Sequence, residues 1–337
     1  DTARKMVTEG MVLLKNDNNT LPLKKDETVS VFGRMQNYYY KSGTGSGGMV
    51  NVSRVVGIMD ALLEREDIKI NKDLADVYVQ WGKEHPVDLG LGWGQEPWSQ
   101  AEMPVTEELV HEAADKSEAA IVIIGRTAGE EKDITLEEGA YSLTKTEYEM
   151  MKLVRKHFKK MTVLLNVGGI IDMSFMDIIS PNACMYVWQG GMIGGYGVVD
   201  VLTGDVSPSG KMTDTIAYDI KDYPSGKLAE TIPFSEKDTP AWRYFAPPND
   251  DVEYRESIFV GYRYYETFHV PVKYPFGYGL SYTEFEIAVE NAVYDSENGN
   301  INISATVTNV GNCTGKEVVQ VYVEAPQGSL GKATKVL

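Results

Sequence analysis

The stretch AAIVIIGR, residues 119–126, is apolar at every position before its closing Gly-Arg pair. A run of this kind, without alternation, is typical of a parallel strand whose sheet is covered by helices on both faces. TVLLNVG (162–168) and CMYVWQG (184–190) have the same character, and TVSVFGR (28–34) is a shorter β-branched run. These strands predict a layered α/β sandwich with a mostly parallel sheet.

Helical patterns lie between these runs, as alternation of strands and helices requires. Thr144 and Glu147 form a capping-box pattern, which predicts a helix from there to about Phe158. The spacing of apolar residues also predicts helices at residues 3–14, 54–65 and 107–117.

The C-terminal part alternates with period two, which indicates an antiparallel sheet. The three alternating stretches are FEIAVENAVY (285–294), NINISATVTNV (300–310) and KEVVQVYVEA (316–325). A fibronectin-like sandwich needs about seven strands in about 100 residues. We therefore interpret residues 276–337 as the first part of an incomplete antiparallel β-sandwich, in a chain that is a piece of a longer protein. Residues 1–275 would form the α/β domain, with a long surface excursion at about 206–254.

The net charge of −17, from 32 basic and 49 acidic residues, disfavours nucleic acid and anionic membranes as partners. No apolar run is long enough to span a bilayer, so we expect a soluble protein. Cys184 and Cys313 are far apart, and the four histidines lack zinc-site spacing, so neither a disulfide framework nor a metal site is expected. These features favour a cytoplasmic location and leave the oligomeric state, including a homo-oligomer, open.

In open α/β sheets, ligands bind beyond the carboxyl ends of the strands, which directs attention to the loops after residues 33, 126, 168 and 189. The first loop contains KSGTGSGG (41–48), which matches the dinucleotide fingerprint GxGxxG. The match is weak because about nine residues separate the strand from Gly43. Close approach of this backbone to another ligand, or a tight turn, are the alternative interpretations.

The second loop lies in GRTAGEEKDITLEEGAYSLTKTE (125–147), where Gly129 would turn the chain and aim Glu130 or Glu131 over the end of the sheet. Acidic loops in acidic proteins are usually only solvated, and we read Asp133 and the later carboxylates in that way. A glutamate at the strand end could act as a general acid. Glycoside hydrolysis needs a second carboxylate, and no loop offers one, since Asp172 reads as structural.

Several motifs, taken in order, resemble those of glycoside hydrolase family 3. They are ARKMVTEGMVLLKNDNNTLPL (3–23), KSGTGSGG (41–48), WQGGMIGGYGVVDVLTGDVSPSGKMTDT (188–215), VGYRYYET (260–267), YPFGYGLSYTEF (274–285) and VTNVGNCTGKEVVQVYV (307–323). The resemblance covers nearly the whole chain. It implies the family's α/β-sandwich domain followed by the start of its fibronectin type III-like domain.

The resemblance also implies a retaining β-glycosidase, with an aspartate nucleophile on a (β/α)8 barrel and a glutamate acid/base on the sandwich. The family's acid/base lies in a Gly-Glu pattern with an aspartate three residues later, which selects Glu130 here. Glu131 and Ile134 stand where many relatives have Gly and Arg, which puts contacts to the leaving group in doubt. The residues implied for binding a glycosyl unit are Ser46, Gly45, Thr44 and, more weakly, Lys41.

The family's nucleophile motif is absent from these 337 residues. The domain order resembles members whose barrel follows the sandwich, so we expect the barrel after Leu337 and expect this chain alone to be inactive. The implied function is that of an exo-acting β-glucosidase on terminal non-reducing β-linked sugars, without cofactor or metal. A β-xylosidase or arabinosidase, a non-catalytic carbohydrate-binding or scaffolding fragment, and a dinucleotide enzyme are the alternatives.

Overall fold

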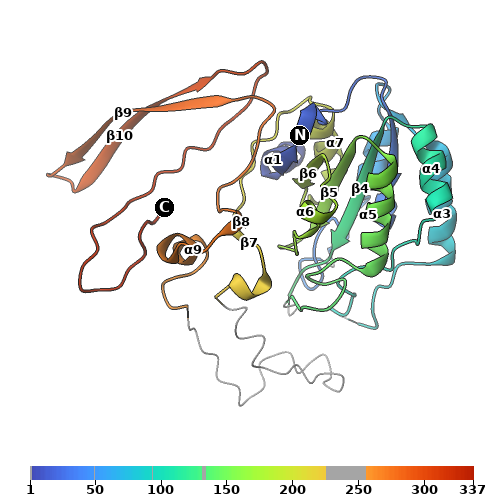
Figure 1. The fold of residues 1–337 in the computed structure, drawn as a ribbon, viewed down its shortest axis with the longest axis horizontal. Coiled ribbons are helices and arrows are strands. Elements are labelled where there is room, and N and C mark those ends of the chain that lie inside the picture. Colours follow the sequence, from blue (N-terminus) through green and yellow to red (C-terminus); the bar gives the residue numbers. More distant parts are fainter. Residues whose placement is uncertain (1, 49, 93, 131–133, 225–255) are drawn as a thin grey trace, which may run out of the picture.

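The chain is represented by a computed structural model that describes residues 2–48, 50–92, 94–130, 134–224 and 256–337. Its centre is a six-stranded sheet in the order β1-β6-β5-β4-β2-β3, in which only β1 runs antiparallel to its neighbour (Figure 1). The strands are β1 (Val12–Asn16), β2 (Thr28–Phe32), β3 (Lys69–Ile70), β4 (Ala119–Arg126), β5 (Met161–Val167) and β6 (Ala183–Tyr186).

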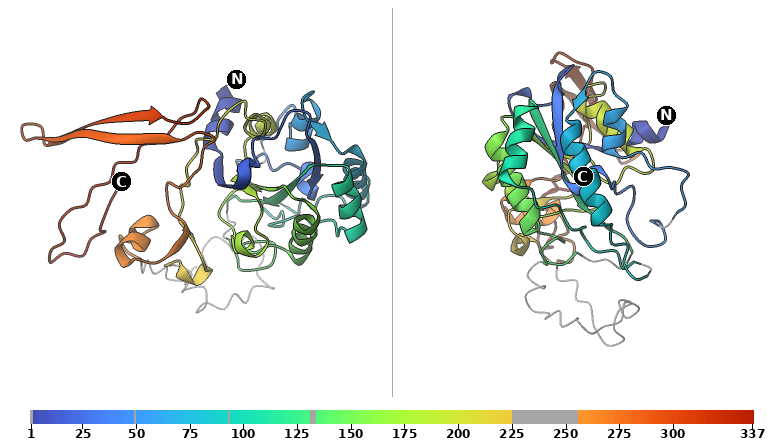
Figure 2. Two further views of the ribbon diagram at one scale, coloured as in Figure 1. Left: turned by 45° about the horizontal axis from the view of Figure 1, so that its top comes forward. Right: turned by 90° about the vertical axis from the view of Figure 1, so that its right-hand side faces the viewer.

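Helices cover both faces of this sheet, as the predicted α/β sandwich requires. On one face lie α3 (Lys72–Glu84), α4 (Glu107–Asp115), α5 (Lys145–His157) and α6 (Phe175–Ile178), and on the other lie α1 (Thr2–Gly10), α2 (Ile58–Leu63) and α7 (Gly194–Leu202). The right-hand view of Figure 2 shows green α5 on one side of the sheet and yellow-green α7 on the other.

The apolar run of β4 explains this layering. Ala120, Val122 and Ile124 pack into the core beneath α3, α4 and α5, whereas the intervening residues pack into the core beneath α2 and α7. All eight residues of the strand are buried. A central strand buried on both faces has no position for a solvated side chain, which is why its sequence does not alternate.

The helix predicted at residues 3–14 is too long. Helix α1 ends at Gly10, and the next residues form β1, which pairs antiparallel with β6. Val12 and Leu14 enter one core and Leu13 enters the other, so the first three residues of β1 are buried on both faces, and their apolar run imitates a helical pattern. The other predicted helices form as α2, α4 and α5, and α5 carries both reciprocal bonds of its capping box.

Residues 207–212 pack against the α/β domain. The backbone N–H of Gly210 donates to Met11 O at 3.1 Å, and that of Met212 donates to Tyr278 O at 2.8 Å. The surface excursion predicted at 206–254 therefore does not begin at residue 206, and residues 225–255 lie outside the described part of the chain. The chain then continues through β7 (Ile216–Ala217), α9 (Tyr262–Phe268) and β8 (Val272–Tyr274), with β7 and β8 antiparallel.

The C-terminal part contains an antiparallel hairpin of β9 (Phe285–Asp295) and β10 (Asn300–Asn309), which extends away from the α/β layers (Figures 1 and 2). The prediction of a third strand at residues 316–325 is wrong, because this segment forms only an isolated bridge, from Val323 to Val336. An alternating strand needs a neighbour for its backbone and a facing sheet for its apolar side. Val318, Val319 and Val321 are instead 43–47% exposed.

Candidate active site at the carboxyl edge of the sheet

Four loops converge at the carboxyl edge of the parallel strands, as the strand-end rule predicts. The loop after β2 meets the loop after β4, where Thr44 N donates to Ala128 O at 2.5 Å. The loop after β6 contacts both, because Gly191 N donates to Lys41 O at 2.8 Å and Gln189 Nε2 donates to Arg126 O at 3.3 Å. The loop after β5 joins them at Gly168, where a Cβ would lie 2.3 Å from Ala128 Cβ.

Asn166 joins two of these loops from inside the sheet. Its side chain accepts a hydrogen bond from Tyr40 N at 2.8 Å and donates to Tyr40 O at 3.0 Å and Trp188 O at 2.6 Å. The residue is fully buried, and each of these bonds satisfies a polar group that would otherwise cost free energy. An asparagine inside the apolar run TVLLNVG is the signal that sequence analysis could have used to find this residue.

Glu130 lies at the surface of this edge, at the turn where the chain leaves β4. Its Oε2 accepts a hydrogen bond from Ser46 Oγ at 2.8 Å and a longer contact from Ser46 N at 3.4 Å. The structure thus brings together the two residues that the sequence singled out from different loops. Glu131 and Asp133 lie outside the described residues.

Two glycines allow this approach. Gly129 has φ of +150°, and a Cβ there would lie 2.2 Å from Thr44 O. Gly45 has φ of +87°, and a Cβ there would lie 2.8 Å from Glu130 Cβ. Both positions exclude a side chain, so Gly129 and Gly45, one from each loop, allow the two loops to lie in close contact. Helix α2 begins only at Ile58, so the loop lacks the helix that a dinucleotide site requires.

The predicted binding residues have different surroundings. Thr44 forms the backbone bridge to Gly129, and Gly45 allows the glycine-rich loop to pack closely against Glu130. Lys41 Nζ donates to Ser42 Oγ at 3.0 Å and to Gly48 O at 3.1 Å, so this lysine closes its own loop.

The acidic loop is anchored by a buried ion pair that sequence analysis missed. Arg126 bonds Glu147 through both terminal nitrogens, at 2.7 and 2.8 Å, and the two side chains are 2% and 4% exposed. The same guanidinium donates to Ala140 O at 3.0 Å and Ser142 O at 3.1 Å. Arg126 therefore holds the end of the loop to the start of α5, and Glu147 is more than a helix cap. The only signal in the sequence is an arginine closing a buried strand.

The remaining carboxylates of this loop are peripheral. Glu137 and Glu138 are exposed, and Glu138 accepts a hydrogen bond from Lys145 N. Asp172 accepts bonds from Ser174 N and Ser174 Oγ, both at 2.8 Å, which is the turn-forming role expected of a structural aspartate.

A second glutamate, Glu102, is buried near the end of β2. Its carboxyl group accepts hydrogen bonds from Arg34 N at 3.1 and 2.9 Å and from Met103 N at 2.7 Å. Burial raises the pKa of Glu102 to about 8, and the charge of Glu147 adds to this, while the two N–H donors oppose it. Nothing in the sequence around this residue distinguished it from a surface glutamate.

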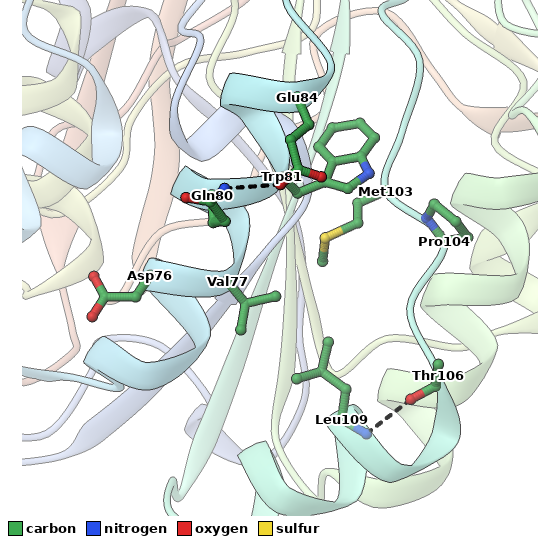
Figure 3. A pocket seen from close by; sticks show the side chains of 9 residues that line it. All are labelled: Asp76, Val77, Gln80, Trp81, Glu84, Met103, Pro104, Thr106 and Leu109. Carbon is green, nitrogen blue, oxygen red and sulfur yellow. Dashed lines mark hydrogen bonds between the residues drawn. The ribbon is translucent and has the colours of Figure 1, made fainter.

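A groove of about 560 Å³ lies between α3 and the segment leading into α4 (Figure 3). The apolar part of its lining includes Val77, Met103 and Leu109. Two acidic residues, Asp76 and Glu84, also line the groove. Its tryptophan, Trp81, is stacked against His85 and lies beneath the guanidinium of Arg34.

The carboxyl group of Glu130 at this edge is placed where it can transfer a proton to or from a bound ligand. A carboxyl group at the surface, bonded through one oxygen, can serve as an acid or a base toward a ligand placed above it. Among the described residues, no cluster of three or more His, Cys, Asp or Glu side chains could hold a metal ion. Within the same residues, no helix is long and apolar enough to cross a membrane.

Comparison with known proteins gives a consistent result. The model of the Glycosyl hydrolase family 3 C-terminal domain matches residues 11–282. A β-glucosidase of Ruminococcus albus is 53% identical over 339 residues, covering 100% of this chain and 33% of that protein.

Solved structures agree in fold. A β-glucosidase from Paenibacillus barengoltzii is 47% identical with a TM-score of 0.89, covering 99% of this chain and 35% of that one. β-Glucosidase 3B from Thermotoga neapolitana in complex with glucose is 33% identical with a TM-score of 0.84, covering 98% and 44%. The chain thus spans less than half of the length of each of these relatives, from 33% to 44%. The family model covers residues 11–282, and the similarity to these relatives extends over nearly all of this chain. The chain therefore belongs to glycoside hydrolase family 3.

Proposed function

We propose that this chain supplies the general acid/base, Glu130, of a retaining exo-acting β-glucosidase that removes terminal non-reducing β-linked glucose. The observation that carries the proposal is the position of Glu130 at the carboxyl edge of the sheet, with Oε2 held by Ser46 Oγ at 2.8 Å. The names of the relatives, β-glucosidases of Ruminococcus albus and Paenibacillus barengoltzii, support the choice of substrate class.

The proposed reaction takes two steps. In the first, a carboxylate nucleophile forms a bond to the anomeric carbon while the glycosidic C–O bond breaks and the proton of Glu130 moves to the departing oxygen. In the second, Glu130 takes a proton from water, whose oxygen bonds to the anomeric carbon as the ester bond to the nucleophile breaks. Retention requires the two carboxyl groups to lie about 5 to 5.5 Å apart.

The nucleophile belongs to a partner domain in this proposal. We infer an aspartate on a (β/α)8 barrel of the same protein, as membership of glycoside hydrolase family 3 implies. Residues 1–275 act as the α/β domain and residues 276–337 as the start of the fibronectin-like domain. A cytoplasmic location stays a prediction.

The closest rival functions share the fold. Two relatives are named as exo-α-(1→6)-L-arabinopyranosidases, of Bifidobacterium longum and Bifidobacterium breve, each 28% identical. The family fold therefore accommodates more than one sugar. A carbohydrate-binding or scaffolding role without hydrolysis is the alternative outside catalysis.

The test replaces Glu130 in the protein that includes its barrel. Glu130→Ala should lower kcat/KM on cellobiose by about a hundredfold or more, because the leaving sugar needs a proton, and by much less on dinitrophenyl β-glucoside. Azide should restore turnover of the activated substrate as a glucosyl azide, because a small anion can replace water once the carboxylate is gone.

Glu137→Gln is the matched control, since Glu137 is an exposed carboxylate of the same loop, and it should leave both rates unchanged. Equal losses on both substrates, or the leaving-group effect at Glu131 instead, would overturn the assignment. A barrel-containing protein that binds glucose without any turnover would favour the scaffolding role.

A further inference from the structure

The carboxyl group of Glu130 forms hydrogen bonds with the glycine-rich loop (residues 41–48) through one of its two oxygens. Ser46 Oγ lies 2.8 Å from Oε2, and Ser46 N lies 3.4 Å from the same atom. Among the residues that the structure describes, Oε1 accepts no hydrogen bond. The two oxygens of the carboxyl group are therefore not equivalent.

The position of Ser46 is set by the backbone. Thr44 N donates to Ala128 O at 2.5 Å, and Thr44 forms a parallel bridge with Gly129, so the two loops run side by side into the contact. Gly45 then turns with φ of +87° and packs where a Cβ would come within 2.8 Å of Glu130 Cβ. Lys41 Nζ closes the far end of the loop on Gly48 O. These contacts fix the loop, so that the side chain of Ser46 lies next to the carboxyl group of Glu130.

A glutamate needs such a contact if it is to transfer protons in a fixed direction. The terminal torsion of the side chain, about the bond to the carboxyl carbon, has a broad profile without sharp staggered wells. A hydrogen bond to one oxygen restricts that torsion. Since both side chains are exposed, the bond is useful chiefly when a substrate and its partner domain exclude water from the edge.

The direction of the bond selects which oxygen carries the proton. A protonated carboxyl group has one hydroxyl oxygen and one carbonyl oxygen, and only the carbonyl oxygen keeps its full accepting capacity. The Ser46 hydroxyl can donate to Oε2 both when Glu130 is charged and when the proton sits on Oε1. The bond therefore survives both steps of the reaction without rearrangement.

We infer that Ser46 is a positioning residue for Glu130, which anchors Oε2 and leaves Oε1 as the oxygen that donates the proton to the leaving group and then removes one from water. This inference rests on the proposed function and deepens it. It differs from the role implied by the resemblance to glycoside hydrolase family 3, in which Ser46 contacts the glycosyl unit.

The test compares leaving groups in the barrel-containing protein. Ser46→Ala should lower kcat on an alkyl β-glucoside by about tenfold, since misdirected protonation forfeits part of the general-acid effect. On dinitrophenyl β-glucoside, whose first step needs little protonation, the cleavage step followed in the pre-steady state should change by less than about twofold. KM should change little on either substrate. Ser46→Thr keeps the hydroxyl and should return the alkyl glucoside rate to within about threefold of the unmodified enzyme.

Ser53→Ala is the control, because Ser53 is an exposed serine of the same connection between β2 and α2, and it should leave all values unchanged. A raised KM with equal losses on both substrates would instead make Ser46 a sugar ligand and overturn the inference, as would an unaltered Ser46→Ala enzyme. Glu130→Gln, measured alongside, distinguishes failure of the role inferred for Ser46 from failure of the proposed function of Glu130. If Glu130→Gln discriminates between the leaving groups and Ser46→Ala does not, only the role of Ser46 is lost. If Glu130→Gln does not discriminate, the proposed function itself fails.

Discussion

Glu102 and Glu130 are both glutamates near strand ends, yet their surroundings differ in every respect. Glu130 is exposed and has one side-chain partner, whereas Glu102 is 8% exposed and accepts bonds from two backbone N–H groups. Burial raises the pKa of Glu102 to about 8. A carboxyl group of this kind holds its proton through the neutral range and binds the backbone of β2 to the segment before α4.

The stability of the protein should therefore depend on pH through Glu102. In the unfolded chain the group titrates at about 4.3. Between that pH and about 8 the folded protein binds the extra proton, so the free energy of unfolding falls as pH rises through this window and levels off above it. Urea unfolding of Glu102→Gln, which cannot ionise, should lack this decline, so the variant should gain stability relative to the unmodified protein from pH 5 to pH 8.

Glu112→Gln, an exposed change on α4, should keep the decline. Parallel curves for Glu102→Gln and the unmodified protein would show that Glu102 does not hold its proton in the folded state.

At the scale of single residues, strand-end placement and the family pattern predicted Glu130 and Ser46 as site residues, and the structure brings their side chains into contact. Asn166, Arg126 and Glu102 escaped because each is a polar residue whose partners are far away in sequence, 21 residues for the bond from Arg126 to Glu147 and 126 for that from Asn166 to Tyr40. Their roles depend on contacts that no local pattern encodes.

At the scale of elements, the start of α5 combines a helix cap with a buried ion pair. Thr144 Oγ1 accepts from Glu147 N at 3.1 Å, and Glu147 Oε2 accepts from Thr144 N at 2.7 Å while it also bonds Arg126. Glu147→Gln should cost about 3 to 5 kcal/mol in the free energy of unfolding, because it leaves the guanidinium of Arg126 buried without its counter-charge. Thr144→Ala should cost only about 1 kcal/mol, the usual value of a lost cap.

The matched control is Glu149→Gln on the same helix, where Glu149 pairs with Lys152 and both side chains are about half exposed. That change should alter the free energy of unfolding by less than about 1 kcal/mol. If Glu147→Gln and Glu149→Gln destabilise equally in urea titrations, the buried pair has no special role.

The elements themselves were mostly predictable, and two of the wrong predictions have clear physical causes. Apolar runs identified β4, β5 and β6, and the capping box identified α5. Residues 12–14 were mistaken for helix because a strand segment buried on both faces shows no alternation. Residues 316–325 do alternate, but a pattern cannot supply the neighbouring strands on which an antiparallel sheet depends.

At the scale of the whole molecule, the β9–β10 hairpin has one apolar face that is exposed to solvent. Ile287 pairs with Val307, and Val289 with Ala305, on one face, while Glu286 and Glu290 lie on the other with Thr306 and Thr308. Ile287, Val289 and Val307 are 46%, 68% and 43% exposed. A two-stranded hairpin with an uncovered apolar face is marginal by itself, and we expect the remaining strands of the sandwich to cover it.

Hydrogen exchange can measure this expectation. Amides of β9 and β10 should exchange at least about tenfold faster in the chain of residues 1–337 than in the longer protein with a complete sandwich. Amides of β4, which is buried between helices, serve as the internal control and should be protected equally in both. Equal exchange of the hairpin in the two proteins would show that nothing packs on its apolar face.

The close approach of Gly45 to Glu130 also has a consequence for evolution and for enzyme engineering. Two positions 85 residues apart in sequence share one volume, since any side chain at residue 45 would overlap Cβ of residue 130. A change in either loop is therefore selected jointly with the other, and relatives that alter one should carry compensating changes in its counterpart. Recombination between such enzymes should place its crossover points outside residues 41–130, so that both loops are inherited from one parent.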